Sequence, residues 1–307
     1  MSDKTDEKII NFMRLRSFAT VLSLILLAGS VLSLVTKGIN WGLDFTGGTL
    51  IEVVYDRPIS SEEIRNQLSE EDYTDAVVQE FGSAQDMLIR IPGDDPALGN
   101  QIANLLGSKH DGTVEVKRVE FVGPQVGERL REQGGLGMLM ALGLVMLYIA
   151  FRFQFKFSVG AVGALAHDSI IVLGMFSALQ LQFDLTVLAA ILAVVGYSLN
   201  DTIIVYDRIR ENFRKRRRGE PEEVINVSLT QTLGRTLATS GTTLMVLLAL
   251  FLFGGEMINN FASALIVGIG VGTYSSIYIA SNLLLYMNIS REDLLVPVKE
   301  DEEDGRP

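Results

Sequence analysis

Cysteine is absent from this chain of 307 residues. A disulfide framework and thiolate metal sites are therefore excluded. Charge is scarce over long stretches, because the 21% of residues that are charged gather in a few segments, while 48% are apolar and the mean hydropathy is +0.30. Apolar runs separated by charged segments are typical of a protein that crosses a membrane several times, and they argue against a soluble enzyme.

A polar, basic segment and an apolar run open the chain. Residues 1–17 carry Lys4, Lys8, Arg14 and Arg16, and the apolar run covers 18–36. The run is longer than the apolar part of a usual secretory signal, and no A-x-A-like cleavage site follows it. We therefore expect an uncleaved first span at 18–36, with residues 1–17 as a cytoplasmic N-terminus.

The polar segment 37–134 has the pattern of a small α+β domain. It contains 18 acidic and 9 basic residues, an excess of acid that places it on the outer side of the membrane. The order β-α-β-β-α-β predicts a ferredoxin-like domain of roughly a hundred residues. Alternating apolar residues predict strands at 49–55, 76–81, 87–91 and 113–121, and helical patterns cover 60–68 and 96–106.

Five further apolar runs predict a membrane domain over 135–290. The loops 181–184 and 254–260 contain no Lys or Arg, whereas basic residues follow the second and fourth spans. The positive-inside rule then places both termini in the cytoplasm. The predicted fold is an α-helical membrane protein with six transmembrane helices, one plus five, and an inserted ferredoxin-like domain. The five spans are expected at 135–151, 158–180, 185–206, 233–253 and 261–286.

Two charged segments are expected on the cytoplasmic side. We interpret 208–232 as a basic loop whose run 214–218 meets lipid headgroups, rather than as a nucleic-acid site. Within it, 221–231 is expected to form a short amphipathic helix along the membrane surface. The acidic tail 291–307 is expected to be disordered.

One carboxylate, Asp201, lies inside the apolar run 185–207. It falls about 24 Å along a helix that starts at Leu185, within a hydrocarbon core of about 30 Å. An ionised, unpaired carboxylate there costs about 3 kcal/mol or more. Asp201 should therefore face other helices or a water-filled cavity and find a partner or hold a proton. Proton handling is the leading hypothesis for this chain.

Arg235 is the expected partner of Asp201. The fourth and fifth spans run in opposite directions, so both side chains should lie at comparable depth near the cytoplasmic side. A carboxylate balanced between burial and a nearby arginine can change protonation with small changes in distance. The alternative is a static buried salt bridge that only sets the register of the two helices.

Further polar residues lie in the third and fourth spans. Asp168 is interpreted either as a second relay group or as a hydrogen-bonded structural carboxylate, and His167 either as its partner or as a packing residue. Side chains near Asp201 are candidates for a polar path around it, although such groups often only hold helices together. These candidates are Ser198, Asn200 and Thr202.

Several motifs resemble the SecF family, whose members are the smaller subunits of SecD/SecF pairs. They are WGLDFTGGT at 41–49, FVGPQVG at 121–127, AHD at 166–168, GYSLNDTIIVYDRIRE at 196–211 and LTQTLGRTLATSGTT at 229–243. The fourth span is also similar to the resistance-nodulation-division superfamily of proton-driven exporters.

The resemblance implies an accessory, non-enzymatic subunit of the Sec translocon channel in the bacterial cytoplasmic (inner) membrane. It implies pairing with SecD into a twelve-span unit that uses the proton motive force to draw preproteins across. Protons are the expected coupling ion, and neither a cofactor nor a nucleic acid is expected. Asp201 and Arg235 match the coupling positions, and Asp168 matches a motif position of open role. The family motif near the first span supplies Gly42, Asp44, Phe45, Gly47 and Gly48.

Two other functions remain open at this point. A stand-alone exporter of lipids or small molecules would use the same relay, but it would usually need a second six-span half. An intramembrane aspartyl protease is suggested by Asp168 and Asp201 on consecutive spans, since two carboxylates can share a proton. The Gly-x-Gly-Asp pattern of that class is missing, because Leu199 and Asn200 precede Asp201. Sodium also remains an alternative coupling ion.

Overall fold

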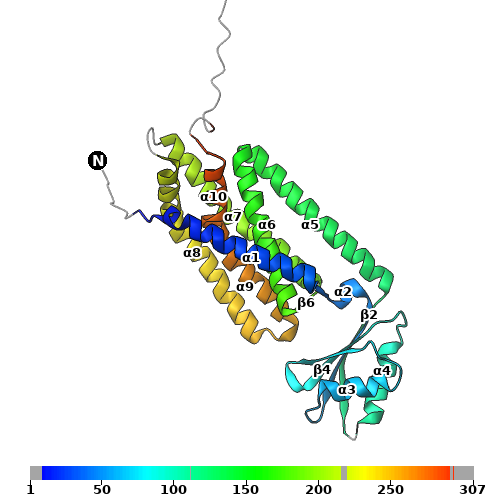
Figure 1. Ribbon diagram of the computed structural model, residues 1–307. Coiled ribbons are helices and arrows are strands. Elements are labelled where there is room, and N and C mark those ends of the chain that lie inside the picture. Colours follow the sequence, from blue (N-terminus) through cyan, green and yellow to red (C-terminus); the bar gives the residue numbers. More distant parts are fainter. Residues whose placement is uncertain (1–8, 111, 216–219, 291–292, 294–307) are drawn as a thin grey trace, which may run out of the picture.

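The computed structural model describes residues 9–110, 112–215, 220–290 and 293. A helical bundle forms one end of the molecule and a small sheet domain the other (Figure 1). The described residues contain six helical stretches that are long and apolar enough to cross a membrane, which confirms the predicted number. They are α1 (Arg16–Thr36), which continues the short helix η1 (Phe12–Leu15), α5 (Pro124–Arg152), α6 (Phe155–Leu179), α7 (Leu185–Lys215), α8 (Pro221–Phe253), and α9 (Glu256–Ile277) with α10 (Ile279–Tyr286).

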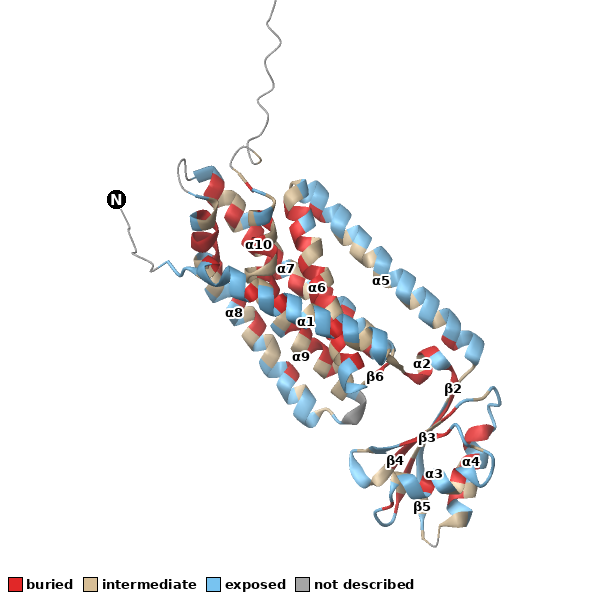
Figure 2. Ribbon diagram, in the orientation of Figure 1, coloured by how far each residue is buried: buried red, intermediate tan, exposed pale blue. Residues whose placement is uncertain are grey.

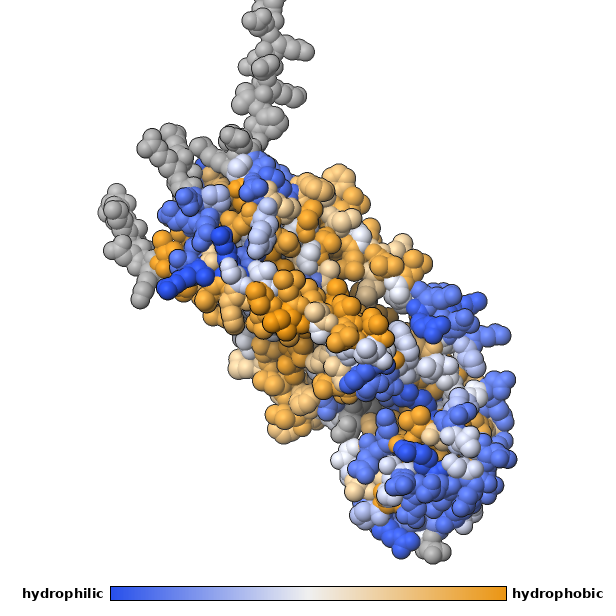
Figure 3. Space-filling model, in the orientation of Figure 1, coloured by the Kyte–Doolittle hydropathy of each residue, from blue (hydrophilic) through white to orange (hydrophobic). Residues whose placement is uncertain are grey.

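Helices α6, α7 and α9 form the centre of the bundle, and α1 and α5 lie at its periphery (Figure 2). Small residues allow the central helices to approach closely. A Cβ at Gly268 of α9, for example, would lie 2.2 Å from Val194 of α7. The peripheral helices expose large apolar side chains such as Phe18 and Phe151. On the face shown in Figure 3, hydrophobic surface covers the bundle and hydrophilic surface lies beyond it, which fits contact with lipid.

The sheet domain has the predicted β-α-β-β-α-β order. Its four antiparallel strands are arranged β3-β4-β2-β5, so that β4 lies between the two strands of the first βαβ unit. Alternate residues of β2, such as Ile51 and Val53, are buried against Ile64 and Ile102 of the two helices. The elements are β2 (Gly48–Tyr55), α3 (Ser61–Ser69), β3 (Val77–Phe81), β4 (Ser83–Ile91), α4 (Leu98–Lys109) and β5 (Val114–Val122).

The segment 208–232 differs from the prediction. It is not a loop with a separate surface helix, because α7 continues to Lys215 and α8 already begins at Pro221. Side-chain contacts hold together the end of α7 (208–215) and the beginning of α8 (221–232), which we call the two extensions. Asn212 Nδ2 donates hydrogen bonds to Ser228 Oγ (2.9 Å) and Gln231 Oε1 (3.0 Å). Apolar residues on both extensions are buried in one cluster, which an exposed surface helix could not provide. The tail expected at 291–307 lies outside the described residues, apart from Asp293.

The second span also begins earlier than expected, at Pro124 rather than at residue 135. Proline suits the first turn of a helix, because its missing N–H would have no partner there. The last span is broken near Tyr278, where α9 ends and α10 begins. The first of these differences matters for function, because α5 starts directly at the sheet domain and continues into the membrane without a linker.

A hydrogen bond in the sheet domain makes its stability depend on pH. His110 Nε2 donates to Asp56 Oδ1 (2.8 Å), and this bond lowers the pKa of Asp56 below its usual value. A carboxylate whose pKa is lower when folded stabilises the fold above its unfolded pKa, and the stabilisation is lost as pH falls through the folded pKa. We expect the thermal midpoint of the full chain to fall as the pH is lowered below about 4, the pKa of an unfolded aspartate, and to fall less in Asp56→Ala. The same change at the exposed Asp75 should leave the fall unaltered.

Candidate functional site

The carboxylate of Asp168 lies at the centre of the bundle and is 1% exposed. Its Oδ2 accepts hydrogen bonds from Ser198 Oγ of α7 (2.6 Å) and Ser275 Oγ of α9 (2.8 Å), and its Oδ1 lies 2.9 Å from His167 Nδ1. Close approach of α9 makes this possible, since a Cβ at Gly272 would lie 3.0 Å from Cβ of Ser198. Asp168 therefore joins three helices through a buried polar cluster.

Asp201 lies one turn along α7 from Ser198 and is also 1% exposed. Ser240 Oγ of α8 donates a hydrogen bond of 3.4 Å to Asp201 Oδ2, and a 2.7 Å hydrogen bond joins Ser240 Oγ to Thr273 Oγ1 of α9. Asp201 Oδ1 is buried and has no hydrogen-bond partner among the described residues. Compared with Asp168, Asp201 is only weakly held.

The two carboxylates are separate sites in one polar layer that crosses α6, α7, α8 and α9. Asp168 and Asp201 share no hydrogen bond within the part of the chain that the structure describes. Each has its own hydroxyl partners, Ser198 and Ser275 for Asp168, and Ser240 with Thr273 behind it for Asp201. This arrangement does not resemble a paired-carboxylate protease centre, in which the two acids share a proton.

Arg235 does not form the direct pair that was considered for it. It lies on α8 within range of electrostatic interaction with Asp201, but its side chain is on the exposed surface of the bundle. No ion pair within 4 Å joins the two among the described residues. Asp201 is thus close to a positive charge without being neutralised by it in this conformation.

The other candidate residues have different positions. His167 and Ser198 contact Asp168 directly. Thr202 is buried beside Asp201, and its hydroxyl has no hydrogen-bond partner among the described residues. Asn200 is exposed on the outer surface of α7 and contributes nothing to the polar path within this chain. Sequence reasoning did not connect Ser240 and Thr273 with Asp201, because hydroxyl side chains are frequent in these spans and local sequence does not show which of them face the acid.

The geometry suits reversible protonation of Asp201. Removing a charged carboxylate from water is unfavourable, and a single weak hydrogen bond does not compensate for it. A proton on the free Oδ1 removes the charge, whereas proximity to Arg235 favours the ionised form. Asp168, by contrast, accepts hydrogen bonds from two serine hydroxyls and has His167 beside it. The two buried carboxylates therefore differ in how firmly their surroundings hold them.

The family motif lies at the other end of α7, where the sheet domain joins the bundle. Asp44 Oδ2 accepts a hydrogen bond from the backbone N–H of Leu185, the first residue of α7 (2.9 Å). Asp184 Oδ1 accepts from the N–H of Val187 (2.9 Å). Both acids thus bind free N–H groups of the first turn, where negative charge is favourable. The helix that carries Asp201 is capped by a residue from α2 (Leu43–Thr46).

Strand and aromatic contacts reinforce this junction. β1 (Asn40–Trp41) pairs in parallel with β6 (Gln182–Phe183), a pairing that the sequence did not reveal. The rings of Trp41, Phe45 and Phe183 pack together with centroids 5.4 to 5.9 Å apart. Arg90 of the sheet domain donates a hydrogen bond to the carbonyl of Trp41 (3.0 Å). The beginning of α7 and the sheet domain are therefore joined through residues 40–46.

Gly47 and Gly48 of the motif at 41–49 allow the motif to approach the start of α5 closely. Gly47 and Gly48 have φ values of +70° and +115°, which favour glycine. A Cβ on Gly47 would lie 2.6 Å from Cα of Pro124, and one on Gly127 would lie 2.8 Å from N of Gly47. The motifs at 41–49 and 121–127 are thus in contact, which explains why small residues occur in both.

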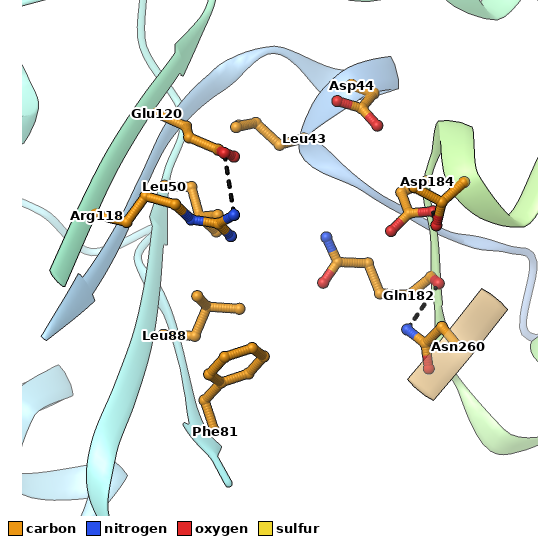
Figure 4. A pocket seen from close by; sticks show the side chains of 11 residues that line it. Leu43, Asp44, Leu50, Phe81, Leu88, Arg118, Glu120, Gln182, Asp184 and Asn260 are labelled. Carbon is orange, nitrogen blue, oxygen red and sulfur yellow. Dashed lines mark hydrogen bonds and ion pairs between the residues drawn. The ribbon is translucent and has the colours of Figure 1, made fainter. Parts of the chain in front are cut away.

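A cavity of about 250 Å³ lies between the sheet domain and the bundle (Figure 4). Leu50 and Leu88 of the sheet line one side, and Asp184 and Asn260 of the bundle line the other. Asn260 Nδ2 donates to the carbonyl of Gln182 (3.1 Å), so the bundle side is fixed by hydrogen bonds.

Removing the Asp44 carboxylate, which caps the start of α7, is expected to loosen the junction between the sheet domain and the bundle. Asp44→Ala deletes one acceptor at the start of α7, and losing a cap costs about 1 kcal/mol. The chain has no cysteine, so spin labels at Ser69→Cys and Leu252→Cys report only the distance between domain and bundle. We expect a broader distance distribution in Asp44→Ala than in the wild type. Asp75→Ala, an exposed acid of the same domain, is the control, and equal distributions in all three proteins would contradict the prediction.

The site and fold define a six-span membrane protein with two buried carboxylates and a sheet domain joined to the start of α7. Two family models match it: "Protein export membrane protein SecD/SecF, C-terminal" over residues 101–290, and "SecD/SecF GG Motif" over residues 32–59. The chain belongs to the SecD/SecF family of protein export membrane proteins.

Individual relatives agree with this assignment. The chain is 54% identical to the protein translocase subunit SecF of Pseudomonas aeruginosa, over 97% of this chain and 98% of that one. It is 44% identical to the SecF subunit of Escherichia coli O157:H7, over 98% and 94%. The crystal structure of SecDF from Thermus thermophilus, described as a translocon-associated membrane protein, matches with a TM-score of 0.85 and 39% identity. That match covers 94% of this chain, which spans 40% of the SecDF chain.

Proposed function

We propose that this chain is a SecF-type subunit of a Sec protein translocase. It acts beside a SecD-type partner and uses the proton motive force to promote late steps of preprotein export across the bacterial inner membrane. One observation carries the mechanism: α7 holds Asp201 within the membrane and is capped at its other end by Asp44 of the segment leading to the sheet domain. Protonation of Asp201 and movement of the sheet domain can therefore both act through α7.

Charge supports one orientation in the membrane. The end of the bundle where η1 begins and α10 ends carries Arg152, Lys156 and the basic end of α7, while the acidic sheet domain lies at the opposite end (Figure 1). The positive-inside rule supports cytoplasmic termini and an outer sheet domain. In this orientation the cavity at the junction opens on the side where preproteins emerge.

The surface of the bundle supports a partner within the membrane. Asn200 and Arg235 are exposed within spans, and so is Thr242. A polar or charged group facing lipid tails is unfavourable, so other helices should cover this face of α7 and α8. A SecD-type subunit with its own spans fits, because the matching SecDF chain is more than twice as long as the part that this chain covers. Arg235 would then lie at the boundary between the subunits.

Proton movement supplies enough energy for a modest conformational shift. Moving one charge through 100 mV is worth about 2.3 kcal/mol, which shifts an equilibrium between states that differ by a few kcal/mol. Protonation of Asp201 removes its attraction to Arg235 and changes the contact of α7 with α8. Because α7 is continuous to Leu185, the shift reaches the hydrogen bond to Asp44 and tilts the sheet domain.

Two solved SecDF structures match this chain to different extents. The first matches this chain with a TM-score of 0.85, and the second, titled a super-membrane-facing form, with 0.68. Their identities to this chain are 39% and 40%, so sequence divergence does not explain the difference. SecDF thus adopts more than one arrangement.

Gentle isolation of the protein from its native membrane tests the assignment. We expect a SecD-type membrane subunit to come with it, together with components of the translocon channel. A homo-oligomer without a second subunit would favour a stand-alone exporter and contradict the proposal. Export of a preprotein into the outer compartment should also slow when the chain is depleted, and should recover when it is restored.

A further inference from the structure

A cavity of about 290 Å³ lies between α1, α6 and α10, apart from the residues that contact Asp201. We call it the His167 cavity. Apolar side chains and one glycine form much of its wall, and no Asp, Glu, Lys or Arg of the described residues lines it. Its polar lining residues are Thr20 and Ser23 of α1, His167 of α6, and Asn282 and Tyr286 of α10.

The His167 cavity extends from one end of the bundle to its middle. Tyr286 is the last residue of α10 and is 67% exposed, so this end of the cavity lies at the surface. His167 lies halfway along α6, about 18 Å from the first residue of that helix. In the orientation proposed above, the end of α10 is cytoplasmic. The cavity therefore leads from the cytoplasmic side towards the centre of the membrane.

Two buried polar atoms in the wall of this cavity have no partner. His167 and Asn282 are each 4% exposed. Neither His167 Nε2 nor Asn282 Oδ1 has a hydrogen-bond partner among the residues that the structure describes. Asn282 Nδ2 donates to Thr20 Oγ1 (3.2 Å), which fixes the orientation of the amide. Because buried polar atoms in folded proteins nearly always have a partner, these two atoms point to a polar occupant of the cavity.

Water fits the His167 cavity better than an acyl chain does. A water molecule takes about 30 Å³ in the liquid and needs two to four polar partners, so the volume is sufficient for several molecules. The hydroxyls of Thr20 and Ser23 line the same cavity and can continue a chain of hydrogen bonds. An acyl chain would leave His167 Nε2 and Asn282 Oδ1 buried without hydrogen bonds, which is unfavourable.

His167 lies between this cavity and the buried carboxylate of Asp168. Its Nδ1 is 2.9 Å from Asp168 Oδ1, so Nε2 is the ring nitrogen left for the cavity. Tyr274 of α9 packs near the ring, with centroids 6.3 Å apart, but its hydroxyl donates to the carbonyl of Ala19 (2.7 Å). Asp168 is therefore the titratable group in direct contact with the ring. An imidazole that has one nitrogen on an acid and the other on water can pass a proton between them.

We propose that the His167 cavity binds water and that His167 exchanges protons between this water and Asp168. A proton on Asp168 Oδ1 passes to Nδ1, the imidazolium ring releases its Nε2 proton to water, and Asp168 is left as the carboxylate. The reverse steps return a proton to Asp168. The role of this exchange in export rests on the function proposed above. It gives Asp168 a connection to the cytoplasmic side that does not pass through Asp201 or Arg235.

Nuclear magnetic resonance of the full chain in lipid nanodiscs, with isotope-labelled histidine, tests the water site. The chain contains two histidines, so His110→Gln assigns both ring signals. We expect the ring of His167 to exchange magnetisation with water. Asn282→Leu should reduce this exchange at least fivefold. Ser281→Ala, a buried hydroxyl of α10 that does not line the cavity, is the matched control and should change it less than twofold.

Two outcomes of this experiment would overturn the water site. The first is transfer of magnetisation to the His167 ring from lipid acyl chains in place of water. The second is the same water exchange in Asn282→Leu as in the wild type. Thermal melting confirms that each variant is folded.

Export by vesicles that contain the full translocase tests the proton exchange. His167→Gln keeps a side chain that forms hydrogen bonds but does not titrate, and it should reduce the gradient-dependent part of export at least fivefold. His167→Ala should lose the same part, and added imidazole should restore at least half of it. Imidazole should not restore the gradient response of Asp201→Asn. A purely structural role of His167 predicts no restoration by imidazole.

These results distinguish the proton exchange from the proposed function. A wild type whose export does not respond to the gradient would contradict the proposed function, and the resonance experiment, which needs no export, then decides the water site. If the wild type responds, an equal response in His167→Gln would overturn proton exchange through His167. Failure of imidazole to restore the response of His167→Ala would overturn it as well.

Discussion

Asp201→Asn is expected to abolish the proton-dependent part of export while leaving assembly intact. The amide has the shape of the carboxylic acid, so packing against Ser240 is kept, but it can neither gain nor lose a proton. In vesicles that contain the translocase, the difference between export with and without an imposed proton gradient should fall at least tenfold. The SecD-type partner should still co-purify in wild-type amounts.

Two further variants make the Asp201 result specific. Asp201→Glu keeps a titratable group on α7 and should restore part of the gradient response. Glu220→Gln removes an exposed acid outside the relay and should leave the response unchanged. A normal gradient response in Asp201→Asn would show that the proton acts elsewhere. Loss of the partner from that variant would show that the carboxylate serves assembly, and would likewise contradict the mechanism.

Gly48→Ala is expected to destabilise the junction between sheet domain and bundle strongly. Gly48 has φ of +115°, and an added Cβ would lie 2.6 Å from the carbonyl oxygen of Ile91, a backbone atom that β-sheet pairing holds in place. Backbone strain of this kind costs about 1–3 kcal/mol, and the clash adds to it. We expect a clear fall in the thermal midpoint and slower export.

Trp41 reports on this change directly, because it is the single tryptophan of the chain and lies in the same segment. Its fluorescence should shift towards that of solvent-exposed tryptophan at a lower temperature in Gly48→Ala. Gly38→Ala is a matched control, since Gly38 also has positive φ (+69°) but nothing lies within 4 Å of an added Cβ. A control midpoint as low as that of Gly48→Ala would mean that backbone strain alone, and not close approach, explains the effect.

The spans and the sheet domain could be predicted because they depend on local patterns. A run of about 20 apolar residues must be helical in lipid, since every backbone polar group needs a partner there. The alternation in TVEVKRVEF likewise predicted β5 (Val114–Val122) to within one residue at each end. Element boundaries at charged segments were less predictable: polar residues 208–232 fit a loop as well as a helix until tertiary contacts such as Asn212 to Ser228 are known.

The amino-acid sequence alone predicted six spans and a ferredoxin-like insertion. It also predicted an acid at position 201 that must be paired or neutralised. Only the tertiary structure decided which groups surround that acid. It brought Ser240 and Thr273 to the Asp201 layer, left Arg235 on the surface, and joined Asp44 to the start of α7. Contacts between residues about 40 to 140 positions apart depend on how helices pack, and no local pattern encodes that packing.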